Sequence, residues 1–195
     1  MVSHDILDLF LETGAYLQGH FRLTSGLHSG SYLQSALVLQ HPQHAEALGR
    51  SLADSLRELA GNEGVAAVIA PALGGLIIGH EVARALGVRF VFTERDADRK
   101  MSLRRGFTIS AGERVVVVED VITTGGSTME VIEIVRAAGA IPVAAGSIVD
   151  RSGGAADLGI PRAALLTLQV QAYQPEQCPM CQAGEPLVKP GSRPA

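Results

Sequence analysis

The chain has 195 residues, of which 47% are hydrophobic, 18% charged and only 4% aromatic. This length suits one domain with its own core, and the composition excludes a disordered chain. The net charge of −4 argues against general nucleic-acid binding. No apolar run reaches the roughly 20 residues of a membrane span, and residues 1–10 lack the features of a signal peptide. We therefore expect a soluble cytoplasmic protein with no nucleic-acid or membrane partner.

The N-terminal region, residues 1–40, is predicted to begin with a helix and to continue as a short strand and turn. Apolar residues follow helical spacing over residues 4–13, and Gly14 closes the helix. Apolar and polar residues then alternate from residue 19 onward until Ser25 and its following glycine break the run. By itself this pattern indicates an ordinary β-hairpin.

A glycine-containing turn follows the first strand of the predicted core. After a helix at 42–60, residues 65–70 form a short apolar run that is typical of a buried strand. This strand leads into residues 71–75, which read P-A-L-G-G. Two glycines at the carboxyl end of a strand let backbone amides approach a ligand closely. From the spacing alone, a purely structural tight turn is about equally expected.

A cationic segment follows the next predicted strand, residues 88–93. Residues 94–106 are polar, mixed in charge and too long for an ordinary connection, and such long loops are usually lids or disordered. Residues 84–105 carry seven cations and three acids, a charge of +4, so the remainder of the chain carries −8. We interpret Asp96 and Asp98 as a solvated charge run and the cations as functional. A local cationic patch on an acidic protein suggests a small anionic ligand.

The most informative stretch is residues 114–129. An unbroken β-branched run at 115–118 predicts a strand buried on both faces. Glu119 and Asp120 follow it, and residues 123–128 then read T-T-G-G-S-T before a helical pattern. A hydroxyl-rich glycine loop between a strand and a helix can bind an anion, because backbone N–H groups and the helix N-terminus face it. The two acids suit ribose hydroxyls or a metal held through water. One sugar phosphate could therefore contact both the acids, through its ribose, and the loop, through its phosphate.

The same loop also has an ordinary interpretation, because strand–glycine–helix turns occur throughout α/β proteins. It is not a Walker A loop, since no lysine follows the glycines, and the chain contains no G-x-G-x-x-G. What makes this motif specific is therefore the order in which apolar residues, acids and hydroxyl residues follow one another.

Two further strands are predicted near the C-terminus, at 142–149 and 165–170. The first ends in Asp150 and Arg151, which could simply form a local ion pair at a turn. Ligands of open α/β sheets lie at the carboxyl ends of the strands, so this end belongs to the same edge as the two glycine loops.

The C-terminal tail contains the pair Cys178 and Cys181 in a C-x-x-C spacing. A zinc site needs four ligands, and this spacing supplies two with no second cysteine pair in the chain. We therefore predict reduced thiols or an occasional disulfide. Zinc shared by two such pairs across a dimer axis is the minor alternative.

Four of these segments resemble the motifs of one family. Residues 115–128 resemble the phosphoribosyl-diphosphate (PRPP) binding motif of the type I phosphoribosyltransferases, and P-A-L-G-G resembles their diphosphate loop. F-x-L-x-S-G-x-x-S-x-x-Y, from Phe21 to Tyr32, and I-V-D-R at 148–151 are similar to the N-terminal segment and orotate-binding strand end of the orotate branch. The resemblance covers about residues 5–170.

The resemblance implies the type I phosphoribosyltransferase fold, an α/β architecture. A central five-stranded parallel sheet is flanked by helices, with a small hood from the N-terminal segment. It implies one domain over 1–195, divided into an N-terminal helix and hood at 1–40, an α/β core at 41–170 and a C-terminal tail at 171–195. The implied reaction transfers the 5-phosphoribosyl group from PRPP to orotate. It gives orotidine 5′-monophosphate and diphosphate in UMP biosynthesis, with Mg²⁺ as cofactor. In the family, a mobile cationic loop at the position of residues 94–106, here called the hood loop, acts in the neighbouring subunit's site. The resemblance therefore implies a homodimer.

The resemblance also implies roles for individual residues. The catalytic residues would be Lys100, Arg95, Glu119 and Asp120. The PRPP-binding residues would be these four together with Thr123, Thr124, Gly125, Gly126, Ser127, Ala72, Leu73 and Gly74. The orotate-binding residues would be Thr123, Arg151 and Ser25. A guanidinium suits the carboxylate that distinguishes orotate from uracil. No residue is expected to bind Mg²⁺ directly; PRPP would hold it, with an optional water-mediated contact from Asp120.

The sequence departs from the family pattern at three places. Thr24 stands where many members have a lysine or arginine, and the hood lacks the usual histidine and H-G-E run. Glu119 stands where many members have an aspartate. These departures leave open which hood cation is catalytic, with Arg104 and Arg105 as possible substitutes.

Two other functions remain open at this point. A purine phosphoribosyltransferase would keep the central motif but would not need Arg151 or the Ser25 segment. A non-catalytic regulator that senses PRPP should carry a nucleic-acid-binding surface, and the sequence shows neither a helix-turn-helix before residue 60 nor a basic face beyond the hood.

Overall fold

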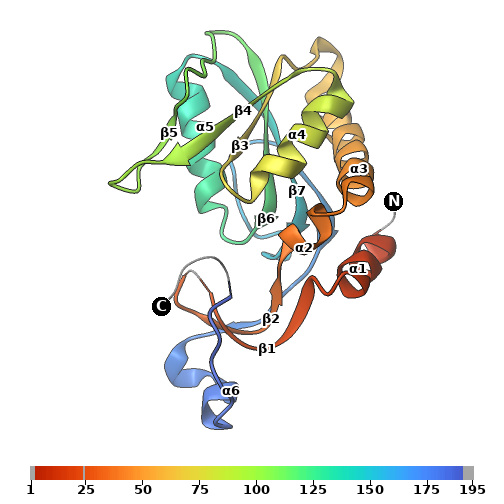
Figure 1. The fold of residues 1–195 in the computed structure, drawn as a ribbon. Helices are drawn as coiled ribbons and strands as arrows, with labels where there is room; N and C mark the ends of the chain where they lie inside the picture. The colour runs from red at the N-terminus through yellow and green to blue at the C-terminus, as the bar shows by residue number, and fades with distance from the viewer. Residues whose placement is uncertain (1–2, 24, 191–195) are drawn as a thin grey trace.

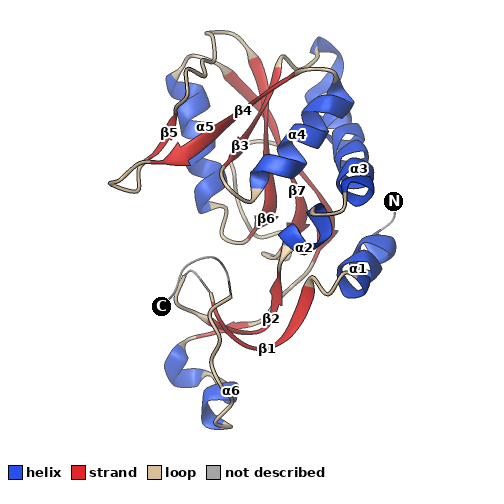
Figure 2. Cartoon of the chain, in the orientation of Figure 1, coloured by secondary structure: helices blue, strands red, loops and turns tan. Residues whose placement is uncertain are grey.

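The central feature of the structure is a six-stranded sheet with the order β5-β4-β3-β6-β7-β8 (Figures 1 and 2). The computed structural model describes residues 3–23 and 25–190, so Thr24 lies outside the described residues. The strands of the sheet are β3 Ala67–Pro71, β4 Arg89–Arg95, β5 Met101–Leu103, β6 Arg114–Ile122, β7 Ile141–Asp150 and β8 Arg162–Thr167.

Five of these strands are parallel, which confirms the predicted five-stranded parallel sheet. The neighbouring pairs β4–β3, β3–β6, β6–β7 and β7–β8 all run in the same direction. The sixth strand, β5, pairs antiparallel with β4, with Arg95 opposite Met101. Most of the segment expected to be a long loop at 94–106 is therefore a β-hairpin, whose turn spans residues 96–100. A three-residue strand among charged residues gives no periodic signal of its own.

Helices cover both faces of the sheet (Figure 1). α3 and α4 lie against one face with α1 and α2 beside them, and α5 lies against the other. No helix among the described residues is both long and apolar enough to span a membrane. The helices are α1 Ser3–Glu12, α2 Ser35–Leu39, α3 Pro42–Ala60, α4 Gly75–Leu86, α5 Gly126–Ala137 and α6 Pro179–Gln182, with 3-10 turns η1 Gly61–Glu63 and η2 Pro175–Gln177.

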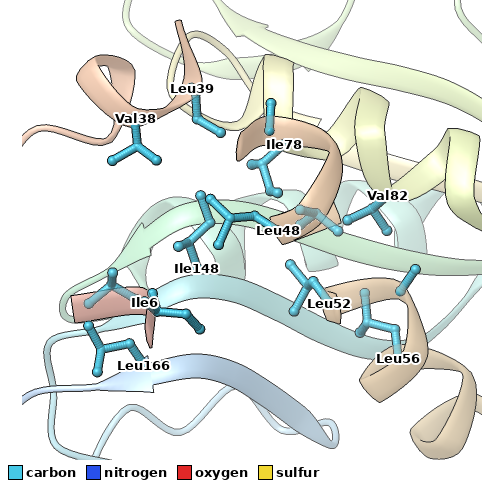
Figure 3. Packing of buried hydrophobic residues seen from close by; sticks show 14 of the residues in the cluster. Ile6, Val38, Leu39, Leu48, Leu52, Leu56, Ile78, Val82, Ile148 and Leu166 are labelled. Carbon is cyan, nitrogen blue, oxygen red and sulfur yellow. The ribbon is translucent and has the colours of Figure 1, made fainter. Parts of the chain in front are cut away.

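Strand β6 divides the core because successive side chains of a strand point to opposite faces. Val116 and Val118 belong to the cluster on the α3–α4 face, whereas Val115 and Val117 belong to the cluster on the α5 face. All four are fully buried, which accounts for the unbroken apolar run in the sequence. Figure 3 shows the first cluster, with side chains from α1, α2, α3, α4, β7 and β8 meeting over the sheet.

A second, three-stranded sheet lies beyond the edge of the α/β core (Figure 1). Its strands pair antiparallel in the order β1-β2-β9, so the last strand comes from the C-terminal tail. The tail then continues through η2 and α6, and Val188 forms an isolated bridge back to Phe21 of β1. We call residues 16–33 and 172–190 together the small lobe. Its strands are β1 Tyr16–Arg22, β2 His28–Leu33 and β9 Ala172–Tyr173.

Candidate functional site

The two glycine loops meet at the carboxyl edge of the parallel sheet. A Cβ atom added at Gly74 would lie 2.5 Å from Oδ1 of Asp120, so the backbone of the first loop rests directly against the carboxylate that follows β6. The N–H of Ala72 donates to the carbonyl of Thr93 at 2.8 Å, which ties this loop to β4. Leu73, joined to Ala72 by a cis peptide bond, is 77% exposed. Gly74 and Asp120, two of the residues assigned to PRPP, are therefore neighbours, and their roles in binding it stay a prediction.

The second loop leads from β6 into α5 and presents exposed hydroxyl groups. Thr123, Thr124 and Ser127 are exposed, and no side chain caps the N-terminus of α5. Gly125 has φ +82°, and a Cβ there would lie 2.8 Å from the Leu158 side chain, so this position requires glycine. The first amides of α5 therefore remain available, together with the hydroxyls, to an anion.

The two acids of the site have different surroundings. Glu119 is 8% exposed, whereas Asp120 is half-buried at the loop junction. Burial, followed by the charge and proximity of Asp120, raises the pKa of Glu119 well above its ordinary value of 4.5. Asp120 is thus the acid whose carboxylate is accessible to a ligand on the loop side.

Arg151 lies beside the second loop and has an unpaired guanidinium nitrogen. The backbone N–H of Arg151 donates to the carbonyl of Ile122 at 2.8 Å, which places the end of β7 next to the start of the hydroxyl loop. Its Nε atom is buried without a hydrogen-bond partner among the described residues. Burial lowers the pKa of Arg151, an effect opposed by Tyr32 and Tyr16. A buried donor without a partner is rare in folded proteins, and here it marks a place for an acceptor.

The local pair of Asp150 and Arg151, the ordinary alternative to a binding role for Arg151, does not form among the described residues. Asp150 is 1% exposed and instead binds Arg162 of β8. Its Oδ1 atom also accepts hydrogen bonds from the backbone N–H and the hydroxyl of Ser152, at 2.7 and 2.6 Å. Burial would raise the pKa of Asp150, but the hydrogen bonds from Ser152 and Arg162 outweigh burial and lower it. The carboxylate is fully engaged, and Arg151 is free for another anion.

Tyr32 is the last residue of the N-terminal motif at 21–32. No role was assigned to it from the sequence, but the structure places it near the site. It lies on β2 and is half-buried; burial raises its pKa, Asp120 raises it further and Arg151 lowers it. Its hydroxyl is therefore within electrostatic range of both Asp120 and Arg151. The small lobe thus covers the edge of the core sheet through β2.

The hood cations lie on the β4–β5 hairpin. Both terminal nitrogens of Arg95 donate to Glu130 of α5, at 2.9 Å each. Lys100 is exposed at the end of the hairpin turn, and Arg105 pairs with Glu94. Within the described residues, neither Arg95 nor Lys100 contacts the acid pair. Their predicted catalytic roles remain predictions.

Ser25 belongs to the small lobe and not to the core sheet. It is exposed in the turn between β1 and β2, and no hydrogen bond joins it to Thr123 or Arg151 in the part of the chain that the structure describes. Its predicted contact with orotate stays a prediction.

Comparison with known proteins agrees with this geometry. The profile of the phosphoribosyl transferase domain matches residues 35–169, which is more than half of the chain. The chain belongs to this family. It is 58% identical to the orotate phosphoribosyltransferase of Pelotomaculum thermopropionicum over 99% of both chains. It is 55% identical to that of Desulforamulus reducens over 99% of this chain and 98% of the relative.

A solved structure from the same branch has the same fold. The orotate phosphoribosyltransferase of Aeropyrum pernix superposes with a TM-score of 0.68 at 28% identity, covering 84% of this chain and 94% of that one. The phosphoribosyltransferase family, its orotate branch and the fold predicted from the motifs are therefore confirmed.

Proposed function

We propose that this phosphoribosyltransferase transfers the 5-phosphoribosyl group of PRPP to orotate, giving orotidine 5′-monophosphate and diphosphate in pyrimidine biosynthesis. The observation that carries the proposal is the buried, unpartnered Nε of Arg151 beside the hydroxyl loop. Orotate bears a carboxylate, and a guanidinium binds a carboxylate through strong charge-assisted hydrogen bonds. The two close relatives bear the same name as the proposed activity.

The two loops suit the two ends of PRPP. The exposed hydroxyls and free amides at the start of α5 are suited to the 5-phosphate. The glycine backbone at 74, which rests on the Asp120 carboxylate, is suited to the diphosphate end, with Asp120 near the ribose hydroxyls. In the reaction the bond from C1′ to the diphosphate oxygen breaks and diphosphate leaves with the electron pair. N1 of orotate loses its proton to water and bonds to C1′. Positioning and electrostatic stabilisation then supply the catalysis.

The oxygen ligands at this site suit Mg²⁺, but the protein offers only one accessible carboxylate, that of Asp120. Mg²⁺ prefers oxygen ligands, keeps several waters and is commonly held by substrate phosphates with one or two carboxylates. Asp120 is the accessible carboxylate at the loop junction, whereas Glu119 is buried. When bound, Mg²⁺ would neutralise charge on the diphosphate. Asp120 would contact it through water, in line with the prediction that no residue binds it directly.

A homodimer with a shared site is the second part of the proposal. Lys100 is exposed at the end of the turn of the β4–β5 hairpin, which projects from the sheet (Figure 1). Among the described residues it forms no ion pair with Glu119 or Asp120. A lysine that serves the partner's site would explain this position. Mixing inactive Lys100→Ala and Arg151→Ala chains should then restore up to about a quarter of native activity, because hybrid dimers contain one intact site. Recovery of no activity in verified hybrid dimers would refute action in trans.

The experiment for the reaction is diphosphate release from PRPP and Mg²⁺, with orotate, uracil, adenine, hypoxanthine and guanine each supplied separately. We expect turnover with orotate alone. Arg151→Ala should lower kcat/KM for orotate by about 10²-fold or more, since removing one partner of a buried charge pair costs about 2–5 kcal/mol. Arg136→Ala, on the exposed side of α5, is the control and should keep full turnover. Turnover with a purine would refute the orotate assignment, and PRPP binding without turnover on any base would favour a regulator.

A further inference from the structure

The small lobe contains a cluster of four metal-ligand side chains that the proposed reaction does not use. His20 of β1, His28 of β2, Cys178 and Cys181 offer ligand atoms that all lie within 4.8 Å of one another. Three of the four residues are buried, with exposures of 3% for His20, 5% for His28 and 0% for Cys178. They come from two strands at one end of the chain and a turn and helix near the other.

The distances match a tetrahedral zinc site. Nε2 of His20 lies 3.0 Å from Nδ1 of His28, 3.5 Å from Sγ of Cys178 and 3.6 Å from Sγ of Cys181. Sγ of Cys181 lies 3.3 Å from Nδ1 of His28. Bond lengths of about 2.0 Å to nitrogen and about 2.3 Å to sulfur give tetrahedral edges of roughly 3.3 Å between nitrogens and roughly 3.6 Å between nitrogen and sulfur. The four observed separations agree with these edges to within a few tenths of an ångström.

Hydrogen bonding alone does not explain the arrangement. Nε2 of His20 faces three partners, yet a neutral ring nitrogen carries either one proton or one lone pair. The other ring nitrogen, Nδ1, lies 2.9 Å from the carbonyl of Glu185 and can bond to it only by donating a proton. That bond fixes the tautomer and leaves the lone pair of Nε2 directed at the centre of the cluster. A backbone carbonyl that orients a histidine in this way is the usual outer partner of a zinc-bound imidazole.

The described residues of the small lobe form no apolar core of their own that would hold it together. Neither η2 nor α6 contains a buried residue, and β9 has only two residues. The buried residues of the lobe are mostly ligands or polar, namely His20, Phe21, His28, Ser29, Leu33 and Cys178. Small units that cannot bury enough apolar surface are usually held by disulfides or metals. Here both cysteines are free thiols.

We propose that His20, His28, Cys178 and Cys181 bind one structural Zn²⁺ ion that fastens the C-terminal tail to the β1–β2 hairpin. Two thiolates and two imidazoles in a closed tetrahedron are the ligand set of structural zinc, with no open position for substrate. The ion would link residues about 150 positions apart and, through β2, would hold the strand that carries Tyr32. The expected absence of a bound zinc within one chain is thus revised, because the second ligand pair consists of histidines and not cysteines.

The test starts with the metal content of the full-length protein, purified without chelator. We expect one zinc per chain by elemental analysis. Replacement by Co²⁺ should give the intense visible absorption of a tetrahedral site and a sulfur-to-cobalt charge-transfer band. Removing the ion with a strong chelator should lower the Tm by several degrees and speed trypsin cleavage after Arg22 of β1, and adding Zn²⁺ should reverse both effects. Because these measurements use the natural chain, they do not depend on a variant that folds.

Variants then assign the ligands. Cys181→Ser and His28→Ala should each lose the stoichiometric zinc and the cobalt spectrum. His80→Asn is the matched control, since His80 is 63% exposed on α4 and outside the cluster, and it should keep both. A protein without zinc whose Tm is unaffected by chelator and Zn²⁺ would overturn the proposal. A Cys178–Cys181 disulfide in the freshly purified protein, or full zinc content in Cys181→Ser, would overturn it as well.

Discussion

The α/β core and the small lobe are stabilised in different ways. In the core, helices bury apolar side chains against both faces of the sheet, and Val115 to Val118 are all fully buried. In the small lobe, the buried positions are largely histidines, cysteine and serine. The core can therefore rely on the hydrophobic effect, whereas the lobe needs specific bonds. The proposed reaction site lies where the two regions meet, with the two glycine loops on the core and Tyr32 on the lobe.

The largest effect on the core should come from the buried ion pair behind the site. Arg162→Met leaves the Asp150 carboxylate, 1% exposed, without its cation. Breaking a buried pair in this way costs about 3–5 kcal/mol, which urea unfolding can measure. Arg136→Ala, which removes an exposed pair with Glu133, should cost less than about 1 kcal/mol.

The Arg162 effect should also depend on pH. Hydrogen bonds lower the pKa of folded Asp150 below its ordinary 3.8, so its ionised form stabilises the fold above that pH and loses this contribution as the pH falls. The difference between parent and Arg162→Met should shrink towards low pH. A constant difference across the acid range would contradict this assignment.

The next effect separates catalysis from stability. Gly74→Ala would place a Cβ 2.5 Å from Asp120 Oδ1, so the carboxylate must turn away. We expect kcat/KM to fall by about 10²-fold, as for a misplacement of about 1 Å, with little change in Tm. Gly30→Ala in the small lobe meets only the Met180 sulfur at 3.7 Å and should be neutral in both assays. A large loss of Tm in Gly74→Ala would contradict this account.

A smaller effect concerns the buried acid. Burial and then Asp120 raise the pKa of Glu119 above 4.5, so ionisation opposes folding as the pH rises above that value. Glu119→Gln should therefore gain stability relative to the parent between about pH 5 and pH 8, while it loses activity. Thermal unfolding across this range measures the gain, and the exposed Glu133→Gln should show none. A gain that is independent of pH would count against a buried ionising carboxyl.

The smallest effect is expected on the hood. Arg95 and Glu130 form a partly exposed ion pair, and such pairs contribute about 0–1 kcal/mol. Glu130→Gln should change the free energy of unfolding by no more than this amount in urea titrations. A loss of several kcal/mol would mean that the hairpin is part of the core and not an attached hood.

The same contrast explains what could be predicted from the sequence. The five parallel strands and the two glycine loops at their ends were predictable, because buried strands are continuous apolar runs and their loops carry local glycine and hydroxyl signals. Strand β5 was missed because three residues among charges have no period. The Asp150–Arg162 pair joins neighbouring strands and leaves no local trace. The metal cluster was missed because His20 and His28 are about 150 residues from the cysteines, and only folding brings the two pairs together.

The measurement that tests this contrast most directly is amide hydrogen exchange of the full-length protein with Zn²⁺ and after chelation. We predict a loss of protection confined to residues 16–33 and 172–190, with β3, β6 and β7 unchanged. Unchanged exchange in the small lobe would contradict the proposed metal link. An equal loss throughout the sheet would contradict the separate stabilisation of the two regions.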